Sequence, residues 1–145
     1  MELLPGTRTE DVAEMARIFM TVIPHARALG MELVEAIPGV VEIAMPWSAD
    51  FVGDPRTGVL HGGVISALMD TCCGAAVMTH PTRPATTATI DLRIDYLRSA
   101  TPGQRVRTRA ECFHMTRSVA FVRAVARDEG DTLVATATGS FTVGG

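Results

Sequence analysis

The chain has 145 residues, of which 47% are hydrophobic and 20% charged, and it carries a formal net charge of −3. These values predict one globular domain over residues 1–145, and the acidic balance argues against general nucleic-acid binding. Residues 1–11 are polar and lack the apolar segment of a signal peptide, while the apolar run Val64–Met78 is too short to span a bilayer. We therefore expect a cytoplasmic protein without a membrane partner.

The first third of the chain predicts a helix followed by strands. Apolar residues recur at helical spacing over residues 10–29. Pro24 is expected to kink or divide this helix, and Gly30 is a natural stop at its C-terminal end. Residues 31–45 then predict one or two strands around a turn at Pro38-Gly39.

A loop, an apolar helix and a run of strands make up the remainder. Residues 47–58 predict a loop with a turn signal, and residues 63–79 predict an apolar helix that Pro81 and Pro84 close. Four antiparallel strands are predicted over residues 87–97, 104–115, 118–127 and 133–143. Because one apolar helix needs a curved sheet to cover it, this order favours an α+β fold.

Alternation in the first of these strands assigns its side chains to two faces. The apolar face would carry Ile90, Leu92 and Tyr96, and the polar face would carry Thr89 and Asp91. This pattern is typical of a strand with one face toward a core.

The apolar helix contains a single charged residue, Asp70. Burying a carboxylate costs several kcal/mol unless it is hydrogen-bonded or paired. Asp70 is therefore either a structural residue with satisfied partners or a general base or nucleophile whose pKa is tuned by apolar surroundings.

His61-Gly62-Gly63 stands where this helix begins. Glycines let a ligand approach the backbone closely, and the first amides of a helix lack intrahelical acceptors and lie at the positive end of the dipole. Such amides suit a carbonyl oxygen that becomes an oxyanion. A glycine-rich helix entry and a core histidine explain the motif equally well when it is taken alone; its combination with Asp70 favours chemistry.

Arginine is distributed unevenly along the chain. All 13 basic residues are arginines, and nine of them lie within residues 83–127. The acidic residues in that stretch are Asp91, Asp95 and Glu111. Two explanations stay open: codon bias from a GC-rich genome, or a phosphate-binding face, since arginine offers phosphate a planar fork of donors.

The chain offers little for metal or redox chemistry. Its cysteines are an odd set without CxxC or zinc-ligand spacing: Cys72, Cys73 and Cys112. We expect reduced thiols, no metal and no cofactor. The histidines other than His61 are scattered and are expected to be structural or surface groups: His25, His80 and His114.

Two segments, VLHGGVISALMDTCCGAA and TTATIDLRIDYLRSATPG, carry a specific resemblance. Together with the order of elements, they resemble hotdog-fold acyl-CoA thioesterases of the phenylacetate-degradation (PaaI-like) group, in the 4-hydroxybenzoyl-CoA thioesterase superfamily. The resemblance extends from about Met20 to the end of the chain. It implies a long central helix wrapped by a curved antiparallel sheet, and subunits that pair into homodimers and often into homotetramers built as dimers of dimers.

The resemblance also implies roles for individual residues. The family's catalytic carboxylate falls on Asp70, its oxyanion amide on Gly62 and its histidine on His61. Its serine or threonine at the start of the following strand falls on Thr89. The family often has an asparagine six residues before the histidine, near the water or thioester, and this chain has Pro55 there.

The expected reaction is hydrolysis of an acyl-CoA thioester to a free acid and CoA, with coenzyme A entering as part of the substrate. Asp70 would act as general base or nucleophile, and Gly62 N–H would hold the oxyanion. His61 would fix the loop or the carbonyl, and Thr89 would orient Asp70 or the water. The residues expected to contact substrate or CoA phosphates are Gly63, Arg98, Arg117 and Ser118.

Two other functions remain open, because a fold does not fix a function. A non-catalytic acyl-CoA binding protein would keep the groove and the arginines without needing the Asp70 carboxylate. A hotdog-type dehydratase would act on a 3-hydroxyacyl group and release no free thiol.

Helix geometry predicts how the site is assembled. Gly62 and Asp70 are eight residues apart, which is about 12 Å of rise in a helix. A base and an oxyanion donor must both lie roughly 3 Å from the reacting groups. We therefore expect a homodimer with antiparallel central helices, in which Asp70 of one chain faces Gly62 of the other.

Overall fold

The computed structural model describes residues 9–145, so the part of the predicted polar start that precedes residue 9 lies outside the described residues. Its elements are α1 (Thr9–Val22), α2 (Pro24–Ala28), β1 (Glu32–Ile37), β2 (Val40–Met45), a 3-10 turn (Ala49–Phe51), β3 (Val52–Asp54), β4 (Val59–Leu60), α3 (Gly62–Met78), β5 (Thr89–Tyr96), β6 (Val106–Met115), β7 (Val119–Arg127) and β8 (Leu133–Thr142). The apolar helix and the four strands after it are confirmed, with ends that differ by one or two residues at most.

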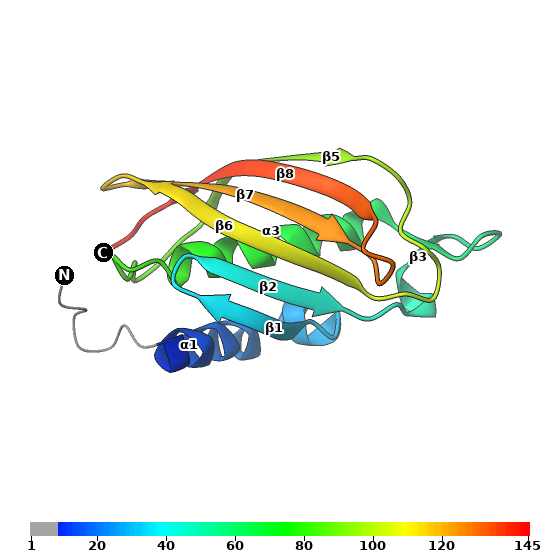
Figure 1. Ribbon diagram of the computed structural model, residues 1–145, viewed down its shortest axis with the longest axis horizontal. Helices are drawn as coiled ribbons and strands as arrows, with labels where there is room; N and C mark the ends of the chain where they lie inside the picture. The colour runs from blue at the N-terminus through cyan, green and yellow to red at the C-terminus, as the bar shows by residue number, and fades with distance from the viewer. Residues whose placement is uncertain (1–8) are drawn as a thin grey trace.

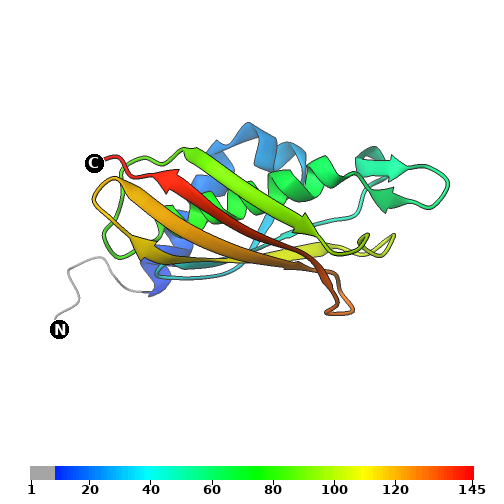
Figure 2. The ribbon, with the colours of Figure 1, turned by 90° about the horizontal axis from the view of Figure 1, so that it is seen from above.

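Six strands form one antiparallel sheet in the order β1-β2-β6-β7-β8-β5. The sheet curves around α3, which runs along its inner face (Figure 1). Both α1 and α3 lie on that side of the sheet (Figure 2), and α1 packs against β1 beside α3. The predicted α+β fold, with a long central helix and a curved antiparallel sheet, is confirmed.

The core lies between α3 and the inner face of the sheet. The sheet-facing side of α3 is buried and includes Ile65, Leu68, Met69, Cys72 and Ala76. Small alanines on β7 and β8 let the helix approach the sheet closely: Ala120, Ala124, Ala126, Ala135 and Ala137. Residues 9–145 contain no helix with both the length and the apolar character needed to cross a membrane.

The N-terminal expectations are confirmed in most respects. Pro24 separates α1 from α2, and Gly30 follows with a φ of +69°, a conformation that favours glycine. The loop expected over residues 47–58 is wrong in part, because β3 and β4 pair there as a small antiparallel hairpin. These strands have three and two residues, which is too short for any alternation to be recognised in the sequence.

A β-bulge at the start of β5 overturns the face assigned to Thr89. Thr89 pairs with Phe141 and Asp91 pairs with Ser140, so Ile90 is an extra residue between them. The side chain of Ile90 is 56% exposed instead of facing the core. Thr89, predicted on the polar outer face, turns toward α3.

Candidate active site

Asp70 lies at the middle of α3, on the side of the helix that the sheet does not cover. Thr89 Oγ1 donates a hydrogen bond to Asp70 Oδ1 at 2.7 Å. Asp70 is half-buried, so the apolar helix is partly open to solvent on this side. The structure thus brings together two of the predicted site residues, and the bulge in β5 is what turns Thr89 toward the carboxylate.

A pocket of about 360 Å³ opens beside Asp70. Its apolar walls come from α1, α3, the start of β5 and β8, and include Phe19, Ile23, Ala67, Gly74, Ala88 and Phe141. Its volume lies within the range of small-molecule sites. The pocket places a carboxylate next to an apolar cavity, an arrangement that suits a substrate with an apolar chain and a polar reacting group.

His25 lines the same pocket, although the sequence suggested only a surface or structural role for it. It belongs to α2, whose start is set by Pro24. No spacing in the sequence connects residue 25 with residue 70, because the pairing depends on how α1 and α2 fold back against α3. The place of His25 at this pocket can therefore be recognised only from the folded structure.

His61 is the N-cap residue of α3. Its Nδ1 accepts a hydrogen bond from Gly63 N–H at 2.8 Å. Within residues 9–145 no acceptor is hydrogen-bonded to Gly62 N–H. The amide of Gly62, which was assigned to the oxyanion, is thus available to a ligand. The amide of Gly63, which was assigned to substrate binding, is already hydrogen-bonded to His61.

Two hydroxyl groups hold the carbonyl oxygen of Gly62, and the sequence had indicated neither. Tyr96 Oη donates to this oxygen at 2.9 Å and Ser66 Oγ at 3.2 Å. The two hydroxyls also lie within hydrogen-bonding distance of each other, so either one can donate to the other in place of the carbonyl oxygen. Alternation had assigned Tyr96 to an apolar face, but its phenol ties the end of β5 to the start of α3.

Strand β5 therefore contacts both halves of the candidate site. Thr89 at its start touches Asp70, and Tyr96 at its end touches Gly62. Asp70 and Gly62 both belong to α3, eight residues and about 12 Å apart along its axis. Within one chain the structure does not bring the predicted base and the predicted oxyanion donor together.

Pro55 occupies the turn of the β3–β4 hairpin. The amides of Thr57 and Gly58 donate to the carbonyl oxygen of Asp54 and close this turn. Pro55 is exposed at its tip. A proline side chain donates no hydrogen bond, so the contact to water or thioester that the resemblance implies for an asparagine is not available at this position.

The cysteine thiols are poor nucleophiles in this structure. Burial, followed by the nearby charge of Asp70, raises the pKa of Cys73 to about 12. Burial also raises the pKa of Cys72 and of Cys112. All three thiols therefore stay protonated near neutral pH.

The predicted CoA contacts lie at opposite ends of the sheet. Arg98 follows β5 and forms an ion pair with Asp128, whereas Arg117 and Ser118 lie in the exposed turn between β6 and β7. The nine residues of β7 separate that turn from Asp128, a distance of about 30 Å in an extended strand. Arg98 and Arg117 of one chain are therefore too far apart to hold the same phosphate group.

Asp128 is the buried anchor of the β7–β8 turn, with 1% of its side chain exposed. Burial alone would raise its pKa, but hydrogen bonds from Arg98 and Thr101, with the charge of Arg98, outweigh burial and lower the pKa to about 2. One carboxylate oxygen also accepts the amide of Gly130 at 3.1 Å. This network gives Arg98 a structural role.

Replacing Asp128 by Asn is expected to destabilise the fold by about 2 kcal/mol at neutral pH, since it removes the charge that Arg98 pairs with. The folded-state pKa is lower than the ordinary 3.8, so this contribution is present above about pH 4 and is lost as the pH falls toward about 2. Urea unfolding at several pH values measures it. Asp50→Asn, at an exposed site, is the control; equal curves for the two variants would contradict the assignment.

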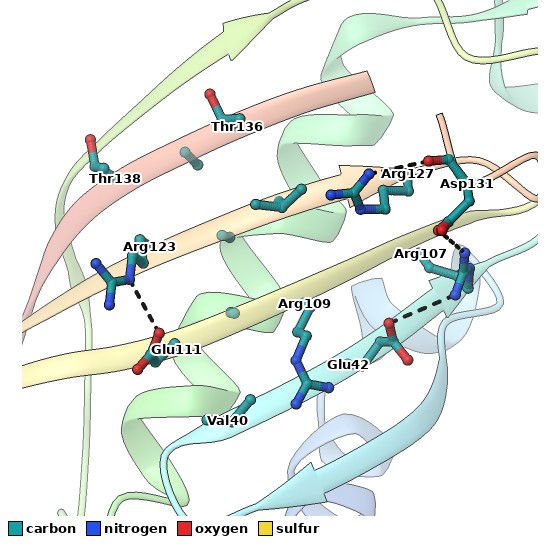
Figure 3. A pocket seen from close by; sticks show the side chains of 14 residues that line it. Val40, Glu42, Arg107, Arg109, Glu111, Arg123, Arg127, Asp131, Thr136 and Thr138 are labelled. Carbon is teal, nitrogen blue, oxygen red and sulfur yellow. Dashed lines mark hydrogen bonds and ion pairs between the residues drawn. The ribbon is translucent and has the colours of Figure 1, made fainter. Parts of the chain in front are cut away.

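The outer face of the sheet carries a second hollow, of about 720 Å³, on the side away from α3 (Figure 3). Arginines of β6 and β7 line it, and each of three pairs with an acid: Arg107 with Asp131 and Glu42, Arg109 with Glu35, and Arg123 with Glu111. Glu35 and Glu42 come from β1 and β2, outside the arginine-rich stretch. Acids outside residues 83–127 therefore offset part of the arginine surplus: Glu35 and Glu42 on neighbouring strands, and Asp131 in the β7–β8 turn.

Comparison with known proteins places the chain in a family. A family model described as "Thioesterase superfamily" matches residues 57–135, more than half of the chain. The Escherichia coli protein named medium/long-chain acyl-CoA thioesterase YigI is 31% identical over 151 residues, covering 95% of this chain and 97% of the relative.

Solved structures agree with the observed fold. The PaaI protein from the phenylacetic acid degradation operon of Escherichia coli superposes with a TM-score of 0.85 at 19% identity, covering 94% of this chain and 96% of that one. A variant of the phenylacetic acid degradation protein PaaI from Thermus thermophilus gives a TM-score of 0.74 at 30% identity, covering 83% and 99%. The structural match at 19% identity supports the fold alone. The family model and the matches at 30% identity or more also support membership of the family. The chain belongs to the thioesterase superfamily as a hotdog-fold, PaaI-like member.

Proposed function

We propose that this chain is an acyl-CoA thioesterase that hydrolyses the thioester to a free acid and CoA. The observation that carries this proposal is the carboxylate of Asp70, held by Thr89 at the wall of an apolar pocket. Membership of the thioesterase superfamily supports it, as does the acyl-CoA thioesterase activity after which the YigI relative is named.

Asp70 acts in one of two ways in this proposal. As a general base, it takes a proton from water, and the water oxygen attacks the carbonyl carbon. The carbonyl electrons move onto oxygen and return as the C–S bond breaks, so that CoA leaves as a thiolate and then takes up a proton. As a nucleophile, Asp70 attacks the carbonyl carbon itself, the C–S bond breaks and CoA leaves as a thiolate; water then opens the resulting anhydride to the free acid and the Asp70 carboxylate. Thr89 orients the carboxylate in either route.

Gly62 N–H is the proposed donor to the oxyanion. It lies at the start of α3, where the helix dipole is positive, and it is free of acceptors within residues 9–145. The hydrogen bonds from Tyr96 and Ser66 to the Gly62 carbonyl fix the local backbone. The N-cap hydrogen bond of His61 supports the same loop.

A homodimer would complete the site. β5 is at the edge of the sheet, and Ile90 and Tyr96 on it are 56% and 49% exposed. An unpaired edge strand with exposed apolar side chains is suited to pairing with another strand. A two-fold axis near the middle of β5 would set Thr89 opposite Tyr96 of the partner subunit, and so would bring Gly62 of the partner subunit toward Asp70.

Arg117 is our candidate for contact with the CoA phosphates. It lines a hollow of about 390 Å³ together with Arg83 and Gly144. Thr86, bridged to Gly144, directly precedes Thr87, which lines the pocket beside Asp70. The two hollows therefore lie along the same edge of the molecule, which suits a ligand with its phosphates at one and its thioester at the other.

Replacing Arg117 by Ala is expected to raise KM for acyl-CoA about tenfold with little change in kcat, because the phosphates lie far from the reacting bond. The difference should shrink at high salt and vanish with thioesters that lack the nucleotide. Steady-state kinetics on both substrate types measure it. Arg105→Ala, directly before the other end of β6, is the control, and an equal rise in its KM would argue against a specific phosphate contact.

A thiol-release screen across short, long and aromatic acyl-CoAs tests the proposed function. Thiol release that depends on the protein supports it. Tight acyl-CoA binding that survives Asp70→Asn, without turnover by the wild type, would instead identify a binding protein. Conversion of a 3-hydroxyacyl-CoA without thiol release would identify a dehydratase.

A further inference from the structure

Gly74 is buried in the interior of α3, where glycine destabilises a helix relative to alanine. The backbone does not require it, because Gly74 is not among the glycines with positive φ. Packing does not require it either: a Cβ built on Gly74 would meet only Cζ of Phe19, at 3.5 Å, an ordinary van der Waals distance. Neither conformation nor packing explains why a side chain is missing here.

The position of Gly74 relative to Asp70 suggests an explanation. The two residues are four apart on α3, so they lie one above the other on the same face of the helix. Both line the pocket of about 360 Å³, and Phe19 of α1 lines it opposite Gly74. A side chain at residue 74 would fill space that runs along α3 from the carboxylate.

We propose that this pocket holds the acyl chain of the substrate and that Gly74 and Phe19 set the longest chain that it accepts. This inference rests on the proposed thioesterase function and adds the determinants of chain length to it. With the carbonyl carbon at Asp70, the chain would extend along α3 past Gly74 toward Phe19 and Ile23. The apolar side chains of Phe19, Ile23 and Phe141 in this lining favour unsubstituted alkanoyl groups over acyl groups that end in a charge.

Size complementarity predicts opposite effects for the two residues. Gly74→Val fills the pocket and should lower kcat/KM about 10- to 100-fold for the longest accepted acyl-CoA, while short substrates keep the wild-type value. Phe19→Ala removes the opposite wall and should move the preferred length upward. Because the two side chains would meet, the double variant should regain long-chain activity relative to Gly74→Val, a coupling that a double-mutant cycle measures.

The experiment measures kcat/KM over a series from acetyl-CoA to palmitoyl-CoA, together with calorimetric binding of S-alkyl-CoA thioethers, which cannot be hydrolysed. Gly74→Ala guards against misfolding of Gly74→Val, since it should be at least as stable as the wild type in thermal unfolding and should shift the length profile in the same direction. Ile18→Ala is the matched control on α1, because Ile18 is 54% exposed and does not line the pocket.

The inference is supported if the profiles of both hydrolysis and thioether binding shift with the size of the side chain at residue 74. It is overturned if folded Gly74→Ala and Gly74→Val keep the wild-type length profile, or lose activity equally for all lengths, while the wild type releases thiol. If the wild type releases no thiol but thioether binding still depends on chain length and on residue 74, the hydrolytic function fails and the acyl pocket stands.

Discussion

Replacing Asp70 by Asn is expected to lower kcat/KM for thioester hydrolysis by about 100-fold or more, the usual loss when a catalytic acid–base group is removed. An amide neither accepts the proton of the attacking water nor attacks a carbonyl carbon as a carboxylate does. The amide oxygen still accepts the hydrogen bond from Thr89, so the geometry around the pocket is retained. Thiol release under subsaturating acyl-CoA measures the change.

Stability separates this effect from misfolding. Asp70 is half-buried, and removing its charge is expected to leave the free energy of unfolding unchanged or raise it. Asp91→Asn is the matched control, because Asp91 lies on β5 two residues after Thr89 and is exposed. Wild-type turnover by a folded Asp70→Asn protein would exclude Asp70 as base or nucleophile.

Two inactive variants are expected to complement each other. Asp70→Ala removes the carboxylate, and Gly62→Leu blocks the amide donor, so each homodimer should be inactive. In a mixed dimer with shared sites, one site receives both lesions and the other receives none. Co-expression should therefore restore activity toward half of the wild-type value per mixed dimer.

Differently tagged chains allow the mixed dimers to be isolated before the assay. The backbone at Gly62 tolerates a side chain, since its φ is not positive and a Cβ there would lie 3.7 Å from the ring of Tyr96. Isolated mixed dimers without activity would mean that each site lies within one chain. A purely monomeric wild-type protein with full activity would lead to the same conclusion.

The sequence was most informative where a pattern is local and long. The apolar run of α3 and the alternation of β6, β7 and β8 each extend over nine residues or more, so their ends were placed to within two residues. The contact between Asp70 and Thr89 was anticipated only through the family resemblance. Strict alternation places Thr89 on the wrong face, because a one-residue bulge reverses the side of every residue before it.

Other parts of the site depend on contacts between distant segments. Tyr96 and Ser66 meet at the Gly62 carbonyl although 30 residues separate them, and His25 reaches the pocket from α2. The arginine surplus was counted within one stretch of chain, while the compensating Glu35 and Glu42 lie on strands far earlier in sequence. The charge balance of a sheet depends on which strands are neighbours. A count of charges along the sequence does not include that information.

The burial of the three cysteines has a consequence for a protein that would produce a thiol at every turnover. Released CoA is readily oxidised to its disulfide, and a reactive cysteine thiolate nearby would attack that disulfide, form a mixed disulfide and release one CoA thiolate. Exchange requires an accessible thiolate, whereas Cys72, Cys73 and Cys112 are buried and their pKa values are raised. The native protein should therefore resist modification by its own product, and an aromatic disulfide reagent should report released CoA without a background from the enzyme.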